Sequence, residues 1–291
     1  MPDLIEISST GLSAAINPFG AELTHLRDAG GRELMTDADP AYWTGHAPIL
    51  FPIVGRLNGD VLSIGGTDYP MKQHGFARRM PFEVIARDPN RAVFRLTDNA
   101  ETRAVYPFAF ALDLAFRIRG ATLEIEARIE NRGEVAMPAS FGWHPAFAWP
   151  LPYGKAREDH RILFAADEPE SLRAIVPGGL IGAAPRPSPL DGRTLHLRDD
   201  LFLNDALIWD QVRSGRVTYG APTGPQLDIA FPGTSKLGIW TKPGAHYVCI
   251  EPWHGIADPQ GFAGAFSDKP GVFEIAPYGD WTCSLDVTLR P

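Results

Sequence analysis

Three short segments combine an ionisable side chain with aromatic residues, glycine or proline. They read KQHGFARR (72–79), ASFGWHPAFAWPLP (139–152) and YVCIEPWHG (247–255). Each has the composition of a loop or a strand end, and binding groups concentrate on loops held by a rigid scaffold. Together they therefore indicate one site that uses proton transfer and aromatic contacts.

Glu251 is the strongest candidate for a general base. It follows the apolar run HYVCI, which has the composition of a buried strand, and it precedes Pro252, which ends the hydrogen-bonded ladder. A carboxyl group at the end of such a strand is poorly solvated, which favours its neutral form and makes it a usable base near neutral pH. The alternative is a structural role in which Glu251 pairs with Arg56 or Arg78.

His144 lies among two tryptophans, a phenylalanine and two prolines. In this setting it is either a core histidine with one hydrogen bond or a proton donor that faces a ligand stacked on aromatic rings. Trp143 and Trp253 are candidate platforms for such a ligand, although buried tryptophans also serve as core residues. Arg78 is either a ligand contact or part of a solvated charged surface together with Arg79.

Other chemistries lack their sequence signatures. His74, His144, Glu251 and His254 could in principle hold a metal, but HExxH and closely spaced Cys/His motifs are absent. The G-x-S-x-G nucleophile motif is also absent, and Cys249 lies within an apolar strand pattern. Phosphate-loop and dinucleotide fingerprints are missing as well. We therefore expect acid–base chemistry on a polyhydroxylated ligand, with no metal and no cofactor.

The bulk composition excludes several classes of partner. The 291 residues carry a formal net charge of -8 and show no basic run, so nucleic acid and anionic membrane surfaces are poor partners. We expect no secretory signal, because the start of the sequence lacks a basic region followed by an apolar one, and no apolar stretch is long enough to cross a bilayer. Two cysteines do not form a disulfide framework, so we expect a cytoplasmic location.

The elements that must position these residues are predicted to be short strands. Plentiful glycine (29) and proline (27) divide the chain, and several segments alternate apolar and polar residues with period two. The pattern predicts a mainly β protein, a large antiparallel β-sandwich, formed as a single domain over residues 1–291. The clearest strands are RAVFRLT, FAFALDLAFRIRG, TLEIEARIE, RVTYG, QLDIAFP, KLGIWT and WTCSLDVTL.

Helical signals are few. The segment EPESLRAIV (168–176) predicts a turn or two of helix, and AYWTGH (41–46) predicts a short helix or turn. Residues 153–193, rich in proline, glycine and charge, predict a long excursion or a loop with a short helix.

Five segments in order resemble the aldose 1-epimerase (mutarotase) family, and are most similar to its divergent bacterial branch. They read ILFPIVGRLNGD, MKQHGFARRMPFEV, SFGWHPAFAWP, LFLNDALIW and YVCIEPWHGIADPQG. The resemblance extends from NPFGAELTHLRD (17–28) to the last strand. It implies the galactose mutarotase-like supersandwich and a reaction that interconverts the α and β anomers of an aldose.

The resemblance also implies roles for individual residues. Glu251 matches the base that removes the anomeric hydroxyl proton, and His144 matches the acid that protonates the ring oxygen. Arg56, His74 and Asp205 match positions that bind sugar hydroxyls. Because His144 must carry a proton to donate it, we expect Glu251 or Asp205 to favour its charged form.

Two departures from the family pattern keep the substrate open. HGFAR stands where typical mutarotases have His-Gly-Gly, and Glu-Pro-Trp surrounds the base instead of Glu-Thr-Gln. The HGFAR form also resembles hexose-6-phosphate 1-epimerases, in which Arg56 and Arg78 would clamp a phosphate. The alternative functions are thus an epimerase that acts on a free or a phosphorylated aldose, a non-catalytic sugar-binding protein, or a structural β module. The oligomeric state is not predicted.

Overall fold

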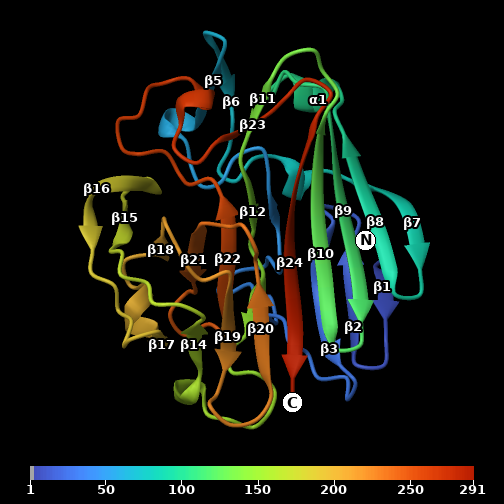
Figure 1. The fold of residues 1–291 in the computed structure, drawn as a ribbon, viewed down its shortest axis with the longest axis vertical. Helices are drawn as coiled ribbons and strands as arrows, with labels where there is room; N and C mark the ends of the chain where they lie inside the picture. The colour runs from blue at the N-terminus through green and yellow to red at the C-terminus, as the bar shows by residue number, and fades with distance from the viewer. Residues whose placement is uncertain (1–2) are drawn as a thin grey trace.

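The computed structural model describes residues 3–291 and consists mainly of antiparallel strands (Figure 1). Two large sheets, of nine and eight strands, share one apolar core that draws side chains from both. The predicted fold class, a large antiparallel β-sandwich, is confirmed. Within residues 3–291, no helix is long and apolar enough to cross a membrane.

The nine-stranded sheet contains the longest strands, which run side by side in Figure 1. Its hairpin between β9 and β10 turns at Gly120–Ala121, where Gly120 has a φ of 58° that suits glycine. In spatial order the strands are β17 (Thr194–His196), β14 (Arg161–Phe164), β19 (Arg216–Gly220), β20 (Gln226–Ala230), β24 (Asp280–Arg290), β10 (Thr122–Asn131), β9 (Phe110–Arg119), β8 (Arg91–Thr97) and β7 (Glu83–Asp88).

The eight-stranded sheet has the apolar strand β22 near its middle. In order it comprises β16 (Leu180–Arg186), β15 (Leu172–Val176), β18 (Leu207–Trp209), β21 (Lys236–Trp240), β22 (Tyr247–His254), β12 (Phe141–Trp143) and β4 (Ile49–Leu50), with β13 (Ala146–Ala148) also paired to β22. Successive side chains of a strand point to opposite faces. Val248 and Ile250 accordingly enter the main core, whereas Cys249, Glu251 and Trp253 face the other side.

Short elements connect and cover the sheets. The small sheets are β1 (Ile5–Ser8), β2 (Leu12–Asn17) and β3 (Glu22–Asp28), then β5 (Val61–Ile64) with β6 (Thr67–Pro70), and β11 (Met137–Ala139) with β23 (Phe273–Ile275). The one-turn helix α1 (Ala100–Arg103) starts at Asn99, whose side chain accepts from the backbone N–H of Thr102. The 3₁₀ turns are η1 (Asn58–Asp60), η2 (Ala77–Arg79), η3 (Arg157–Asp159), η4 (Asp199–Phe202) and η5 (Phe266–Asp268).

The strands predicted from alternation are confirmed, and the expected helix at 168–176 is wrong. Residues Leu172–Val176 form β15, which pairs with β16 across a turn at Gly178–Gly179, both with positive φ. The partner strand and the burial of Leu172 decide the conformation of this short apolar segment. Residues 153–193 contain three strands instead of an irregular excursion, and residues 41–46 contain a turn at 41–42 and no helix.

Candidate active site

A cavity of about 470 Å³ opens on the face of the eight-stranded sheet opposite the main core. The residues lining it include six of the predicted site residues: His74, Arg78, His144, Asp205, Glu251 and Trp253. They come from four separate stretches of sequence. The sheet and the loops above it thus bring most of the predicted site together.

His144 and Glu251 lie against each other at the base of this cavity. Nε2 of His144 is 3.1 Å from a carboxyl oxygen of Glu251, and the residues are 8% and 2% exposed. His144 occupies the break between β12 and β13, which both pair with β22, so its neighbour across the sheet is the strand that carries Glu251. The pairing of Glu251 with Arg56 or Arg78 considered from the sequence does not occur.

Burial controls the protonation of this pair. It raises the pKa of Glu251 well above its usual range, and the Asp205 carboxylate acts in the same direction. Burial also lowers the pKa of His144 to about 3, with Arg78 adding to the effect. The expectation that a neighbouring carboxylate favours the charged imidazole is therefore wrong, because desolvation outweighs it. A neutral acid beside a neutral imidazole nevertheless holds the same number of protons as a carboxylate beside an imidazolium.

His74 meets the pair from the loop that precedes η2. Its ring centroid lies 5.8 Å from that of His144, and its Nδ1 accepts a hydrogen bond from the backbone N–H of Gly55 at 3.1 Å. Because an amide N–H can only donate, the neutral ring carries its proton on Nε2. Burial lowers the pKa of His74 well below its usual value and favours this neutral form.

Two residues of the cavity wall have left-handed backbone conformations that are uncommon for side chains other than glycine. His74 has a φ of 65° and Asp205 a φ of 70°. Such conformations cost on the order of 1–3 kcal/mol and cluster at functional sites. The next residue, Gly75, packs so closely on the backbone of Phe51 that a Cβ there would lie 2.1 Å from the carbonyl oxygen.

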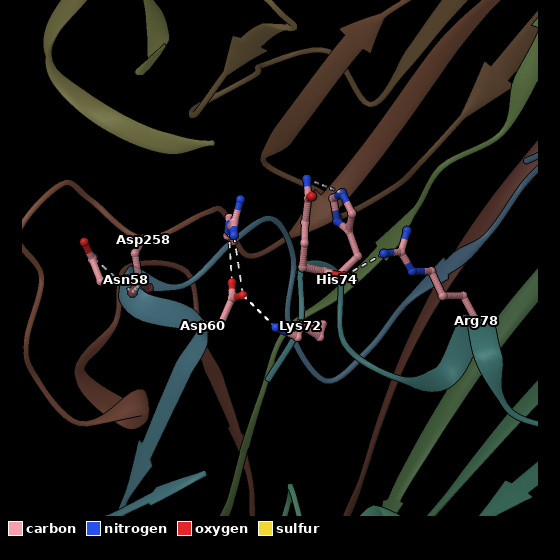
Figure 2. A network of polar contacts seen from close by, with 8 residues as sticks. Asn58, Asp60, Lys72, His74, Arg78 and Asp258 are labelled. Carbon is pink, nitrogen blue, oxygen red and sulfur yellow. Dashed lines mark hydrogen bonds and ion pairs between the residues drawn. The ribbon is translucent and has the colours of Figure 1, made fainter. Parts of the chain in front are cut away.

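Arg78 presents a guanidinium to the cavity without a carboxylate partner. Its Nη2 donates to the backbone carbonyl of Gln73 at 2.7 Å, while its buried Nε has no hydrogen-bond partner (Figure 2). Among residues 3–291, no Asp or Glu lies within ion-pair distance of it. Burial lowers its pKa to about 10. The group is thus a cation with unused donor capacity.

Arg56 lies outside the cavity wall. Its side chain is 44% exposed and its Nε donates to Asp60 at 2.9 Å, an interaction that Asp60 shares with Lys72 (Figure 2). Its neighbour Gly55 and the facing Gly179 do line the cavity. Arg56 is therefore placed beside the site, with its charge already paired.

Trp143 belongs to the core, so the structure does not place it as a platform for a ligand. It is 2% exposed and packs edge-on against Phe141, with ring centroids 4.8 Å apart. As the last residue of β12 it points away from the cavity that its neighbour His144 faces, as alternation requires. His254 also lies off the cavity, where Thr234 shares a hydrogen bond with its Nε2 at 3.0 Å. The four-residue metal set considered from the sequence therefore does not assemble.

Two other tryptophans flank His144 and were missed from the sequence. The ring centroids of Trp43 and Trp240 lie 5.0 and 6.1 Å from that of His144, and 5.7 Å from each other. Both line the cavity, as do Gln73 and Lys242. Trp43 lies in a turn without periodicity, and Trp240 was assigned only to a strand. The alternation of β21 next to β22 is the one signal that could have placed Trp240 on the cavity face.

The chain is similar over nearly its whole length to known sequences and solved structures. The protein LacX, chromosomal, from Lactococcus lactis subsp. lactis is 31% identical over 295 residues, which cover 98% of this chain and 99% of LacX. A galactose mutarotase related enzyme from Lactobacillus acidophilus superposes with a TM-score of 0.91 at 30% identity, covering 99% of this chain and 97% of that one.

A galactose mutarotase-like protein from Lactobacillus casei ATCC 334 gives the same TM-score of 0.91 at 27% identity, with 99% and 100% coverage. The sequence profile of the family described as Aldose 1-epimerase matches residues 3–260. With the fold, the cavity and these similarities together, the chain belongs to the aldose 1-epimerase family.

Proposed function

We propose that this protein is an aldose 1-epimerase that interconverts the α and β anomers of an aldose, with Glu251 as the base and His144 as the acid. The observation that carries the proposal is the 3.1 Å contact between these two side chains in the main cavity of a family member. Both oxygens that must exchange protons are attached to the anomeric carbon. Two groups in contact with each other can therefore reach both.

The reaction needs only the transfer of protons between these groups and the sugar. In its ionised form Glu251 takes the proton of the anomeric hydroxyl, while protonated His144 gives one to the ring oxygen. The C1–O5 bond then breaks, the aldehyde turns about C1–C2, and closure on the other face reverses both transfers. The reactive form differs from the neutral pair only by a proton that crosses from Glu251 to His144. Each transfer contributes typically 10²–10⁴-fold, roughly.

The remaining cavity residues suit a pyranose. Trp43 and Trp240 offer flat apolar faces to the C–H side of the ring, and Trp253 lies on the wall beside Glu251. His74, Asp205 and Arg78 can satisfy hydroxyl groups that would be costly to bury unpaired. The cavity is thus lined for a ligand with one apolar face and many hydroxyls.

A polarimetric assay on freshly dissolved α-aldoses tests the proposal. The wild type is expected to speed the change in rotation, and Glu251→Gln and His144→Asn are expected to abolish most of that acceleration. A Glu251→Gln protein as active as the wild type would show that another group is the base. Sugar binding in calorimetry without any rate acceleration by the wild type would instead identify a sugar-binding protein.

Arg78 favours a second candidate substrate, a hexose 6-phosphate. A half-buried guanidinium without a carboxylate partner can form a bidentate contact with phosphate. We expect Arg78→Ala to weaken binding of the 6-phosphate at least tenfold more than binding of the free hexose, as measured by calorimetry. Equal losses for both ligands would exclude the phosphate contact.

We also propose a cytoplasmic location. Cys249 and Cys283 are both buried and free, which suits a reducing compartment. Fractionation of cells that express the tagged protein tests this, and its recovery outside the cytoplasmic fraction would refute it.

A further inference from the structure

Cys249 brings a third metal-binding atom to the pair that the proposed reaction uses. It lies two residues before Glu251 on β22, so both side chains leave the strand on the same face. The sulfur of Cys249, a ring nitrogen of His144 and a carboxyl oxygen of Glu251 all lie within 4.8 Å of one another. We propose that these three side chains bind a thiophilic divalent cation, such as Zn²⁺ or Cd²⁺, and that this ion excludes sugar from the site.

The donor set fits such an ion. Zinc binds sulfur at about 2.3 Å and nitrogen or oxygen at about 2.0–2.2 Å, so tetrahedral donors lie roughly 3.3–3.6 Å apart. His144 and Glu251, at 3.1 Å, are within a few tenths of an ångström of this spacing, and Cys249 has to approach by at most roughly 1.2–1.5 Å. A rotamer change on a strand residue supplies movement of this size without altering the backbone.

The charges also balance. The thiol and the carboxyl group each release one proton when they bind the cation, so a thiolate and a carboxylate neutralise its two positive charges, and the imidazole binds as a neutral ligand. All three side chains are buried, and the nitrogen of His144 that faces Glu251 is Nε2, so the ion takes the place of the 3.1 Å contact between these two residues. The buried site therefore gains no net charge.

Sulfur decides which ions bind. Thiolate with imidazole favours Zn²⁺ and Cd²⁺ over Mg²⁺ or Ca²⁺, which prefer oxygen. Three protein ligands leave a fourth position for a water molecule on the side that faces the cavity. On the proposed function, inhibition follows because the ion takes the lone pairs with which Glu251 and His144 exchange protons.

The direct test is a titration of the full-length, metal-free protein with CdCl₂, followed by the ultraviolet charge-transfer band of the cadmium–thiolate bond. We expect the band in the wild type and in Cys283→Ala, and its loss in Cys249→Ala. Cys283 is the matched control. It is also buried, but it lies on β24 and packs near Trp143, away from the three proposed ligands. Zinc calorimetry on Cys249→Ser and Glu251→Gln should show affinities reduced by more than about tenfold.

Sugar competition needs no variant. A saturating aldose should reduce the apparent affinity of the wild type for Cd²⁺, and this readout does not depend on turnover. Absence of the band in the wild type, its persistence in Cys249→Ala, or unchanged zinc affinity in a folded Cys249→Ser would each overturn the proposal. Cadmium binding by a protein without epimerase activity would support the metal site while refuting the function, so the two failures are distinct.

Discussion

The molecule contains two buried pairs that each join an acidic and a basic side chain, and the two pairs differ in what surrounds them. His144 and Glu251 meet at 3.1 Å on the cavity floor, where the imidazole Nδ1 has no partner. Lys269 and Asp258 lie 3.6 Å apart beside a second cavity of about 290 Å³. There, Asp258 accepts two hydrogen bonds from Asn58, and Lys269 donates to the carbonyl of Ile256.

The difference separates a pair that can exchange protons from one that holds the chain in place. Burial moves both members of the first pair toward their neutral forms. It lowers the pKa of Lys269 only to about 8, so the lysine remains mostly charged at neutral pH. Asp258 of the second pair also joins two segments beside the site, because its backbone N–H donates to the carbonyl of Arg56 and its carbonyl accepts from the N–H of Ile181.

Glu251→Gln should give the largest effect. If Glu251 is the base, we expect the epimerase rate to fall roughly 10²–10⁴-fold. Because the wild-type carboxyl group is held neutral, the amide is close to isosteric and isoelectronic with it. The free energy of unfolding should therefore change by less than about 1 kcal/mol. Polarimetry measures the rate and urea denaturation the free energy of unfolding. A large loss of stability would show that the His144–Glu251 pair stabilises the fold as the Lys269–Asp258 pair does.

Lys269→Met should show the opposite pattern. Removing one partner of a buried pair leaves the other unpaired and typically costs about 3–5 kcal/mol. We expect a loss of this size in urea denaturation, with the rate at saturating sugar reduced far less than in Glu251→Gln. Lys72→Met is the control, because Lys72 pairs with Asp60 at the exposed surface and should cost below about 1 kcal/mol. Equal losses in both variants would remove the structural role of Lys269.

The pH dependence of stability tests the second pair more finely. Between about pH 8 and 10.5 the unfolded chain keeps the Lys269 proton while the folded protein releases it. The unfolded state then binds more protons, so the free energy of unfolding should rise with pH in this window. Compared with Lys269→Met, the wild type should gain about 3 kcal/mol across it and nothing below pH 8. A flat difference would contradict the lowered pKa.

Trp43→Ala should give the smallest of these effects. Trp43 contacts His144 and lines the cavity, so losing its face should raise KM about tenfold with a smaller change in kcat. Trp143→Phe, as the matched control in the core, should lower stability and leave KM nearly unchanged. Steady-state polarimetry over a range of sugar concentrations separates the two, and the reverse result would restore Trp143 as the platform.

Much of the fold could be predicted because alternation is a local property. The period-two pattern of RAVFRLT and TLEIEARIE corresponds to β8 and β10 with nearly the expected bounds. Residues Leu172–Val176 were misassigned because a short apolar segment suits a helix or a strand equally, and the hairpin partner β16 decides. The information in that case is not local.

The site was predicted as far as composition and family resemblance extend. His144 and Glu251 each lie next to a proline and among apolar residues, a combination visible in the sequence. The expectation that Pro252 ends the strand is wrong, because β22 continues past it to His254 and still pairs with β21. Trp43 could not be found in this way, because its proximity to His144 depends on how a turn folds over β22. The exclusion of Trp143 requires knowing which face of β12 enters the core. The prediction that Arg56 binds the ligand did not take account of Asp60, which pairs with the Arg56 guanidinium and holds it outside the cavity.

The left-handed backbone at His74 and Asp205 places selection for stability in conflict with selection for ligand binding. Glycine at either position would relieve a conformational cost on the order of 1–3 kcal/mol and so favour a sturdier protein. The same exchange would delete a side chain from the cavity wall. A homologue with glycine at both positions is accordingly expected to be more stable to unfolding and to bind the ligand more weakly.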